Sequence, residues 1–262
     1  MADPELLIDV RDGVQTVTFN RPDKMNAWTE SMMEAIVEAV RSAAVDPAVR
    51  VLVFTGQGRA FCIGPDHSLL AKVGELPDAA IRAGYGTPRR LIDAIRAIEK
   101  PVIAAVNGTC VSGGLEFAMA ADVRIAGAGA KFGYPDTKLG LIPAIGGTVQ
   151  LARLVGADRA KLMIFGAELI DARTACDWRL VTETVDDAKL MDRAMELARL
   201  FASRAPLAVG LAKYVITRSE DADMSLAAAA EGLAATLARR TADHAEGMAA
   251  FREKRPPKFH GN

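Results

Sequence analysis

The sequence predicts an α/β fold in which parallel strands are joined by crossover helices, and three observations support this prediction. Two continuous apolar runs, RVLVFT at residues 50–55 and PVIAAV at residues 101–106, are typical of strands buried on both faces. Strand, glycine turn, helix and strand then recur, as VNG, SGGLEFAMAA and DVRIA. From residue 186 onward the apolar spacing is helical only. We therefore expect an α/β core followed by a helical C-terminal segment.

Local patterns place the other elements in order along the chain. Residues 6–10 and 14–20 flank Arg11-Asp12-Gly13 and predict a β-hairpin. Apolar residues at helical spacing predict a helix from Thr29 or Ser31 to about Ala44. The segment from Gly74 to Gly86 contains several glycines and no clear pattern, so we expect a mobile loop there. Further helices are expected over residues 91–98 and around residues 190–201, 211–215 and 226–237.

Composition restricts the class of function. Acidic and basic residues nearly cancel, 33 against 32, and this balance does not favour binding to nucleic acid or to a membrane surface. The three cysteines, Cys62, Cys110 and Cys176, are widely spaced in apolar surroundings. We expect them to be small, reduced core residues rather than disulfide partners or metal ligands. The first ten residues lack the features of a signal peptide, so a cytoplasmic protein is expected.

One carboxylate lies in a stretch that should be interior. The 21 residues between Lys100 and Asp122 contain a single charged residue, Glu116, where a composition of 25% charged residues would give about five. A buried glutamate is costly unless it is paired, neutralised or used in chemistry. It follows a helix start expected at Gly113, where unpaired N–H groups carry a partial positive charge. The pattern indicates either half of an active site or a partner for a buried arginine such as Arg124.

A second carboxylate, Asp136, lies in the segment KFGYPDTKLGLIPAIGGT, before a nearly uncharged run. Two carboxylates in apolar settings suit a general acid–base pair, because desolvation raises their pKa values toward the working pH. Taken alone, Asp136 is also typical of a turn or a helix N-cap. Ser112, which precedes Gly113, does not complete a G-x-S-x-G motif because Cys110 holds the first glycine position, so a serine hydrolase is disfavoured.

Five segments together resemble the crotonase superfamily, and within it the enoyl-CoA hydratase/isomerase family. They are NRPDKMNAW, GRAFCIGPD, KPVIAAVNGTCVSGGLEFAMAADVRIA, FGYPDTKLGLIPAIGGT and EGMAAFREKRPPKF, and they occur in order over nearly the whole chain. The resemblance implies a spiral of ββα units over residues 1–202, which holds the active site, and a helical oligomerisation segment over residues 203–262. It also implies an acyl-CoA thioester as substrate, no separate cofactor, and a homotrimer or a dimer of trimers.

In this family two backbone N–H groups polarise the thioester carbonyl and stabilise an enolate. The resemblance assigns one of them to Gly113 and the other to the residue before Asp66, which here is Pro65. Proline has no N–H, and removal of one such donor typically costs on the order of 10²–10³ in rate. Two interpretations are open. Either the Asp66 N–H or an ordered water replaces the donor, or Pro65 only stiffens a turn in a slightly rebuilt site.

Hydratases of this family use two glutamates, which hold a water for addition across the 2,3-double bond. The matching residues here are Glu116 and Asp136. We expect Glu116 to activate the water at the β-carbon and Asp136 to exchange a proton at the α-carbon. Aspartate is one methylene shorter than glutamate, and a displacement of about 1 Å can cost ~10²-fold in rate.

The resemblance also assigns residues to the CoA moiety. Arg59 suits the ADP phosphates, and Phe251 and Lys254 are expected to close over CoA from a neighbouring subunit. Many family members have a lysine shortly after the aspartate, where this chain has a histidine that we expect to be exposed. Backbone contacts to pantetheine and adenine are expected from the loop residues Ala60, Ile63, Pro65, Asp66, His67 and Ser68.

The sequence as a whole predicts an enoyl-CoA hydratase, a lyase that adds water to a trans-2-enoyl-CoA. One alternative is an isomerase, or another enolate-forming acyl-CoA lyase of the same family. A second alternative is an acyl-CoA-binding protein with little turnover, because Pro65 removes one expected donor. Glu116 and Asp136 argue against a pure binding protein, since binding alone gives no reason to keep desolvated carboxylates.

Overall fold

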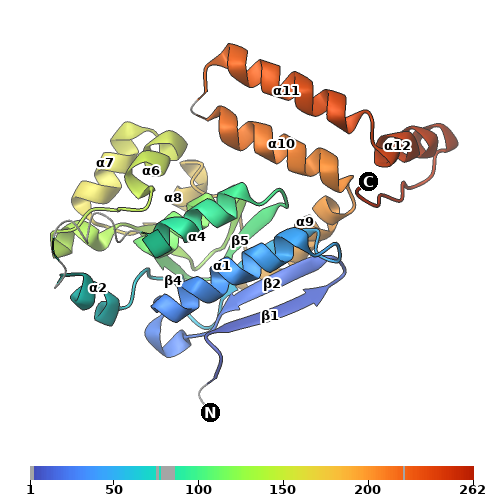
Figure 1. Cartoon of the computed structure of the whole chain (residues 1–262). Coiled ribbons are helices and arrows are strands. Elements are labelled where there is room, and N and C mark those ends of the chain that lie inside the picture. Colours follow the sequence, from blue (N-terminus) through green and yellow to red (C-terminus); the bar gives the residue numbers. More distant parts are fainter. Residues whose placement is uncertain (1–2, 75–76, 78–85, 221) are drawn as a thin grey trace.

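The structure is a computed structural model that describes residues 3–74, 77, 86–220 and 222–262 (Figure 1). Most of the loop expected between Gly74 and Gly86 therefore lies outside the described residues. The predicted hairpin is confirmed as an antiparallel pair of strands with Arg11 opposite Val14. Asp12 and Gly13 both have positive φ at its turn, the conformation that a two-residue hairpin turn requires.

The larger sheet has six strands and contains both apolar runs. Its order is β1-β2-β3-β5-β7-β10, and every neighbouring pair after β1 and β2 is parallel. All five residues of β5 are buried, as expected for a central strand covered on both faces. The strands are β1 (Leu6–Arg11), β2 (Val14–Phe19), β3 (Val51–Gly56), β5 (Val102–Val106), β7 (Val123–Gly127) and β10 (Glu183–Val185).

A second sheet of four strands confirms the predicted spiral. Its order is β4-β6-β8-β9, with β4, β6 and β8 parallel to one another. Three times along the chain, one strand joins the larger sheet, the next strand joins the smaller sheet, and a helix follows. These repeats are the expected ββα units. The strands are β4 (Ala60–Cys62), β6 (Thr109–Val111), β8 (Lys131–Gly133) and β9 (Ile170–Asp171).

Helices cover the sheets, and one of them lies in the core. The predicted first helix is confirmed as α1 (Glu30–Val45), and its N-cap Thr29 accepts a hydrogen bond from the Met32 N–H. All eight residues of α5 (Gly113–Ala120) are buried. Phe117 on α5 packs against Phe54 with ring centroids 5.0 Å apart. The other helices of this part are α2 (His67–Gly74), α4 (Gly86–Ala97), α6 (Gly147–Val155), α7 (Ala157–Gly166) and α8 (Ala172–Asp177).

The C-terminal part is helical, as predicted. The first helix, α9 (Leu190–Ala202), packs its apolar face on β2, β3, β5 and β7 of the larger sheet. The next three are α10 (Pro206–Ser219), α11 (Met224–Ala238) and α12 (Ala242–Glu253), and α11 has no buried residue. Of these three, α10 contacts the core through Lys213, and α11 lies farther from the sheets, on the outer side of α10 in Figure 1.

The cysteines follow the prediction in two cases of three. Cys62 and Cys110 are free, buried and opposite each other on β4 and β6. Burial raises the pKa of the Cys62 thiol to about 12, so this side chain stays a neutral thiol. Cys176 is also free, but the prediction of a core position was wrong for it. It lies on the short helix α8 and is only half-buried.

Candidate active site

Gly113 begins α5 directly after the strand β6 and presents a free backbone N–H. Among the described residues no acceptor lies within hydrogen-bond distance of this N–H. As the first residue of the helix it also lies at the positive end of the helix dipole. Gly113 has no room for a side chain, because a Cβ there would lie 2.8 Å from Trp28 Cζ3. Gly113 therefore has the free N–H and the close packing that an oxyanion donor requires.

The loop that follows β4 lies directly against Gly113. A Cβ on Gly64 would lie only 2.8 Å from the Gly113 nitrogen, and Gly64 has a φ of 88°, which glycine adopts without strain. The next residue, Pro65, has its Cδ 3.3 Å from the position that a Gly113 Cβ would take. The proline ring thus lies against the backbone at the start of α5. A residue other than proline would carry its own N–H where Pro65 carries Cδ.

The neighbouring N–H groups of this loop do not replace the missing donor. The Asp66 N–H donates to the Trp28 carbonyl oxygen at 2.8 Å. The Gly64 N–H donates to the Cys62 sulfur at 3.3 Å. The interpretation in which the Asp66 N–H takes over is therefore wrong in this structure, because that group already has an acceptor.

Glu116 lies one turn into α5, and its carboxylate is held by backbone rather than by a cation. Its Oε1 accepts hydrogen bonds from the Ile145 N–H at 2.9 Å and from the Gly147 N–H at 2.7 Å. The residue is 4% exposed. Burial raises the pKa of Glu116 to about 7; the two N–H groups oppose this rise, and the charge of Asp136 adds to it. A carboxylate with this pKa can accept and return a proton near neutral pH.

The alternative role for Glu116, as the partner of a buried arginine, was wrong. Arg124 donates to three backbone carbonyl oxygens, those of Leu180, Met119 and Ala121. Carbonyl groups at the end of α5 and after it thus satisfy the guanidinium, and Glu116 one turn nearer the helix start is free of it.

Asp136 lies inside the short 3₁₀ helix η2 (Pro135–Leu139), whose N-cap residue is Tyr134, so the alternative of an N-cap was wrong. Its Oδ2 accepts a hydrogen bond from the Ser112 hydroxyl at 3.0 Å. Burial raises the pKa of Asp136, and the Ser112 hydroxyl opposes this rise. The structure therefore brings Gly113, Glu116 and Asp136 together around the N-terminal end of α5.

Several residues of this site were missed by sequence reasoning. The N–H groups of Ile145 and Gly147 hold Glu116, and a Cβ on Gly147 would lie 2.7 Å from Glu116 Oε1. Tyr134 is fully buried and interacts electrostatically with both carboxylates, and its hydroxyl has no hydrogen-bond partner within the described part of the chain. The only available signal was the uncharged, glycine-containing segment IPAIGG after Asp136.

The residues expected to contact CoA fall into two groups. Arg59 is exposed, Ala60 is buried in β4, and His67 and Ser68 are exposed at the start of α2, as expected for the histidine. The Asp66 side chain is already engaged, because its Oδ2 accepts from Arg21 Nη2 at 3.1 Å and its Oδ1 from the Ser68 hydroxyl at 2.9 Å. This loop lies close to Gly113, and Ile63 and Pro65 are half-buried within it. Its contacts with CoA stay a prediction.

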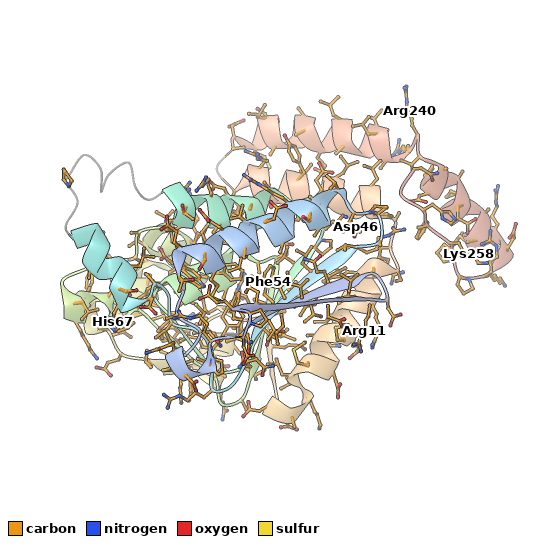
Figure 2. All side chains as sticks on the ribbon, turned by 60° about the horizontal axis from the view of Figure 1, so that its bottom comes forward. Arg11, Asp46, Phe54, His67, Arg240 and Lys258 are labelled. Atoms are coloured by element: carbon orange, nitrogen blue, oxygen red, sulfur yellow. The ribbon has the colours of Figure 1, made fainter. Side chains whose placement is uncertain are left out.

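The C-terminal residues lie elsewhere in the chain. Phe251 is 81% exposed, and Lys254 is an exposed residue that ends α12 with a φ of 53°. In Figure 2, His67 of the α2 region and Lys258, just after α12, lie at opposite ends of the molecule. Phe251 and Lys254 therefore do not reach the site of their own chain, so any contact with CoA would have to involve a second chain.

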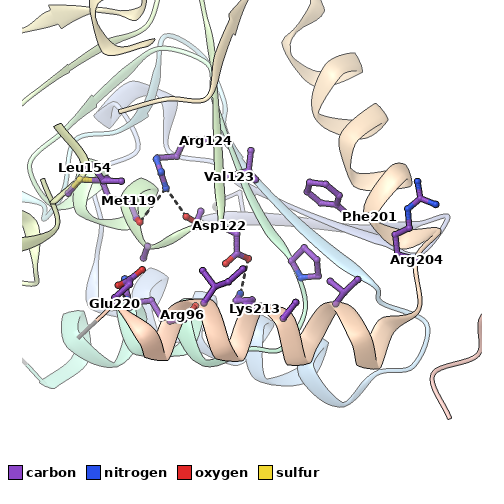
Figure 3. A pocket seen from close by; sticks show the side chains of 17 residues that line it. Arg96, Met119, Asp122, Val123, Arg124, Leu154, Phe201, Arg204, Lys213 and Glu220 are labelled. Carbon is purple, nitrogen blue, oxygen red and sulfur yellow. Dashed lines mark hydrogen bonds and ion pairs between the residues drawn. The ribbon is translucent and has the colours of Figure 1, made fainter. Parts of the chain in front are cut away.

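A cavity of about 520 Å³ lies between α10 and the core (Figure 3). Its lining includes Met119 to Arg124, at the C-terminal end of α5, and none of the predicted site residues. Lys213 of α10 is 7% exposed at its side chain and forms an ion pair with Asp122 at 2.9 Å. This cavity is therefore distinct from the carboxylate site at the other end of α5.

The described residues contain neither a cluster of metal-ligating side chains nor a membrane-spanning helix. No group of three or more His, Cys, Asp or Glu side chains there could hold a metal ion. Within the same residues, no helix combines the length and the apolar character that crossing a membrane requires.

Comparison with known proteins is consistent with this geometry. A family model described as enoyl-CoA hydratase/isomerase matches residues 9–262. A crotonyl-CoA hydratase of Syntrophomonas wolfei is 36% identical over 99% of both chains, and a 1,2-epoxyphenylacetyl-CoA isomerase of Escherichia coli is 35% identical over 98% of both. The crystal structure of an enoyl-CoA hydratase from Bacillus anthracis superposes with a TM-score of 0.93, at 32% identity, over 99% of this chain and 100% of that one.

Proposed function

Because the chain belongs to the enoyl-CoA hydratase/isomerase family of the crotonase superfamily, we propose that it hydrates trans-2-enoyl-CoA thioesters. The observation that carries this proposal is the state of Glu116. Its carboxylate is buried without a cation, is held by two N–H groups, and has a pKa of about 7. It stands beside a second carboxylate and a free N–H, which are the parts needed for proton transfer next to a polarised carbonyl.

In the proposed reaction the thioester carbonyl oxygen accepts the Gly113 N–H. This hydrogen bond and the helix dipole withdraw electrons from the double bond and stabilise the enolate that forms when the β-carbon is attacked. Ionised Glu116 accepts a proton from a water molecule, whose oxygen bonds to the β-carbon. Protonated Asp136 donates its proton to the α-carbon, and the product is a 3-hydroxyacyl-CoA. Exchange with solvent then removes the proton from Glu116 and returns one to Asp136, which restores both groups.

Pro65 bears on the rate of this reaction rather than on its course. The loop lacks the second N–H, and the neighbouring Asp66 N–H donates to Trp28. We therefore expect turnover to be slower than in a protein of the same fold that has both N–H donors. Gly113 would then supply the main stabilisation of the enolate. The same observation supports the second candidate, a protein that binds acyl-CoA with little turnover. A third candidate, an isomerase, is supported by the similarity to the Escherichia coli epoxyphenylacetyl-CoA isomerase.

We further propose that the chain forms a homotrimer or a dimer of trimers through its C-terminal helices. This is supported by the large apolar side chains on α10 and α11 that are exposed in a single chain, including Ile216 at 67%, Leu226 at 66% and Leu233 at 70%. It is also supported by the distance of Phe251 and Lys254 from their own site. A neighbouring chain would cover such a surface. Sedimentation velocity of the purified protein measures the oligomeric state.

The proposed function is tested by isotope incorporation. The purified protein is incubated with short- and medium-chain trans-2-enoyl-CoAs in water enriched in ¹⁸O and deuterium, and the products are identified by mass spectrometry. Hydration places ¹⁸O in a 3-hydroxyacyl-CoA. Deuterium at the α- or γ-carbon without ¹⁸O would instead identify an isomerase or another enolate-forming lyase. Binding of the CoA esters with neither label incorporated would overturn the hydratase assignment.

A further inference from the structure

Ser112 has a backbone conformation that serine rarely adopts. Its φ is 50° and its ψ is −130°, which corresponds to the first central residue of a type II′ turn, where glycine dominates. Residues held in sparsely populated regions of this kind persist only where the surroundings force them, and they cluster at functional sites. Ser112 thus carries a side chain at a position where the backbone conformation favours glycine.

The Ser112 side chain does not do what serine ordinarily does at this place. Ser112 is the N-cap residue of α5, where a serine hydroxyl usually accepts an N–H of the first turn. No such side-chain capping bond forms here, and the N–H groups of Leu115 and Glu116 donate to the Ser112 carbonyl oxygen instead. The hydroxyl is directed to Asp136 Oδ2, at 3.0 Å.

This contact has a specific consequence for Asp136. The aspartate lies on a short 3₁₀ helix followed by Gly140, which has positive φ, and its side chain is half-buried. Ser112 is the one side-chain donor that the described residues supply to this carboxylate. The hydroxyl restricts the rotation of the carboxyl group from one side, and the backbone N–H of Asp136 itself is the other group that hydrogen-bonds to this carboxylate. The other titratable groups that interact with Asp136 are Glu116 on α5 and Tyr134, which precedes η2.

We propose that Ser112 is a positioning residue for the reaction, which holds the Asp136 carboxylate toward the α-carbon of the acyl-CoA. The proposal rests on the proposed function, because it assigns Asp136 to proton transfer. The chain accepts an unfavourable backbone conformation and forgoes a helix cap at Ser112, and in return the hydroxyl orients the proton-transferring group.

The test compares Ser112→Ala with Ser112→Gly. Both variants lose the hydroxyl, but glycine also relieves the positive φ. We expect kcat for enoyl-CoA hydration to fall about 10–100-fold in both, as for loss of a hydrogen bond to a charged group, with KM within about twofold of wild type. The melting temperature of Ser112→Gly should lie about 2–4 °C above that of Ser112→Ala. Ser42→Ala, which removes a hydroxyl bonded to Glu38 on the exposed face of α1, is the matched control and should keep wild-type kinetics.

Two further measurements separate positioning from a purely structural role. Loss of the Ser112 hydroxyl removes a hydrogen bond to ionised Asp136 and so raises the pKa of Asp136. The limb of the kcat–pH profile that reports Asp136 is identified as the one that Asp136→Asn abolishes. In Ser112→Ala this limb should move to higher pH by about one unit. In the Asp136→Asn background, Ser112→Ala should change kcat by less than about twofold, because the two residues act through one contact. Wild-type kcat in Ser112→Gly, or an additive loss in the double variant, would overturn the proposal. Absence of hydration by the wild type would instead contradict the proposed function.

Discussion

The two ends of α5 each bury charged side chains, but they do so in opposite ways. At the C-terminal end the charges are satisfied: Lys213 pairs with Asp122 at 2.9 Å, and Arg124 donates to three carbonyl oxygens (Figure 3). At the N-terminal end two carboxylates, Glu116 and Asp136, lie together, and no lysine or arginine of the described residues pairs with either.

The difference separates a structural cluster from a chemical one. Opposite charges that satisfy one another hold α10 against the core and leave no group free to exchange protons. Burial without a cation raises the pKa of both carboxylates, and the charge of Asp136 adds to the rise for Glu116. Such groups cluster at functional sites. In this protein, charged side chains lie at both ends of α5. The absence of a cationic partner, rather than burial itself, distinguishes the carboxylates proposed to act in catalysis.

Neutralising Glu116 should produce the largest effect on catalysis. Glu116→Gln keeps the oxygen that accepts the Ile145 and Gly147 N–H groups but cannot take a proton from water. We expect the rate of hydration to fall about 10²–10⁴-fold, with acyl-CoA binding largely retained. Steady-state kinetics and binding titration measure the two quantities. Glu38→Gln, an exposed change on α1, is the control, and a loss smaller than tenfold in Glu116→Gln would contradict the assigned role.

Removing the cation at the other end of α5 should instead affect stability. Lys213→Met leaves the Asp122 carboxylate, which is 28% exposed, without its buried partner. Breaking a fully buried pair costs about 3–5 kcal/mol in free energy of unfolding, so we expect a loss of about 2–3 kcal/mol for this partly exposed one. The kcat of the folded enzyme should be unchanged within about twofold. Chemical denaturation at fixed protein concentration measures the loss. The double variant Asp122→Asn/Lys213→Met should recover most of it, and a single-variant loss below about 1 kcal/mol would show that the pair is not structural.

The sequence predicted the N-terminal end of α5 better than its C-terminal end. Glu116 was found because it is the single charge in 21 residues, and Gly113 because a glycine pair follows a strand. The same reasoning offered Arg124 as a partner for Glu116, and it did not anticipate Lys213, which lies 91 residues beyond Asp122 in the chain. A run of apolar residues indicates burial, but a partner is decided by which distant segments meet.

Hydrogen bonds donated by backbone N–H groups could also not be predicted from the sequence. The order of strands and helices follows from local patterns, so the ββα units were predicted. The hydrogen bonds to Glu116 come from N–H groups 29 and 31 residues later, and every residue except proline carries such a group. No residue type marks these donors. Proline is the exception, and for that reason the gap at Pro65 could be predicted from the sequence alone.

The unpaired state of Glu116 also predicts a pH-dependent cost in stability. Its pKa rises from 4.5 to about 7 on folding, so the native state binds a proton more tightly than the unfolded state. Stability contributed by this group is therefore lost as the pH rises from about 4.5 through 7, by about 3 kcal/mol in total. Glu116→Gln should be more stable than wild type by about that amount at pH 8 and by almost nothing at pH 4.5. Denaturation curves at both pH values measure it, and a gain that is independent of pH would contradict the shift.

Pro65→Ala should produce the smallest effect, and it tests whether the N-terminal end of α5 supports the reaction with one N–H donor. Alanine introduces an N–H where the proline Cδ lies against the start of α5, while the Asp66 N–H stays bonded to Trp28. We expect hydration to accelerate about 10–100-fold, somewhat less than the full effect of one oxyanion donor, because the loop was shaped around proline. Pro47→Ala, an exposed change after α1, controls for the loss of a proline elsewhere. An unchanged kcat would mean that the enolate is stabilised without this N–H, and that the helix start at Gly113 is sufficient for the chemistry.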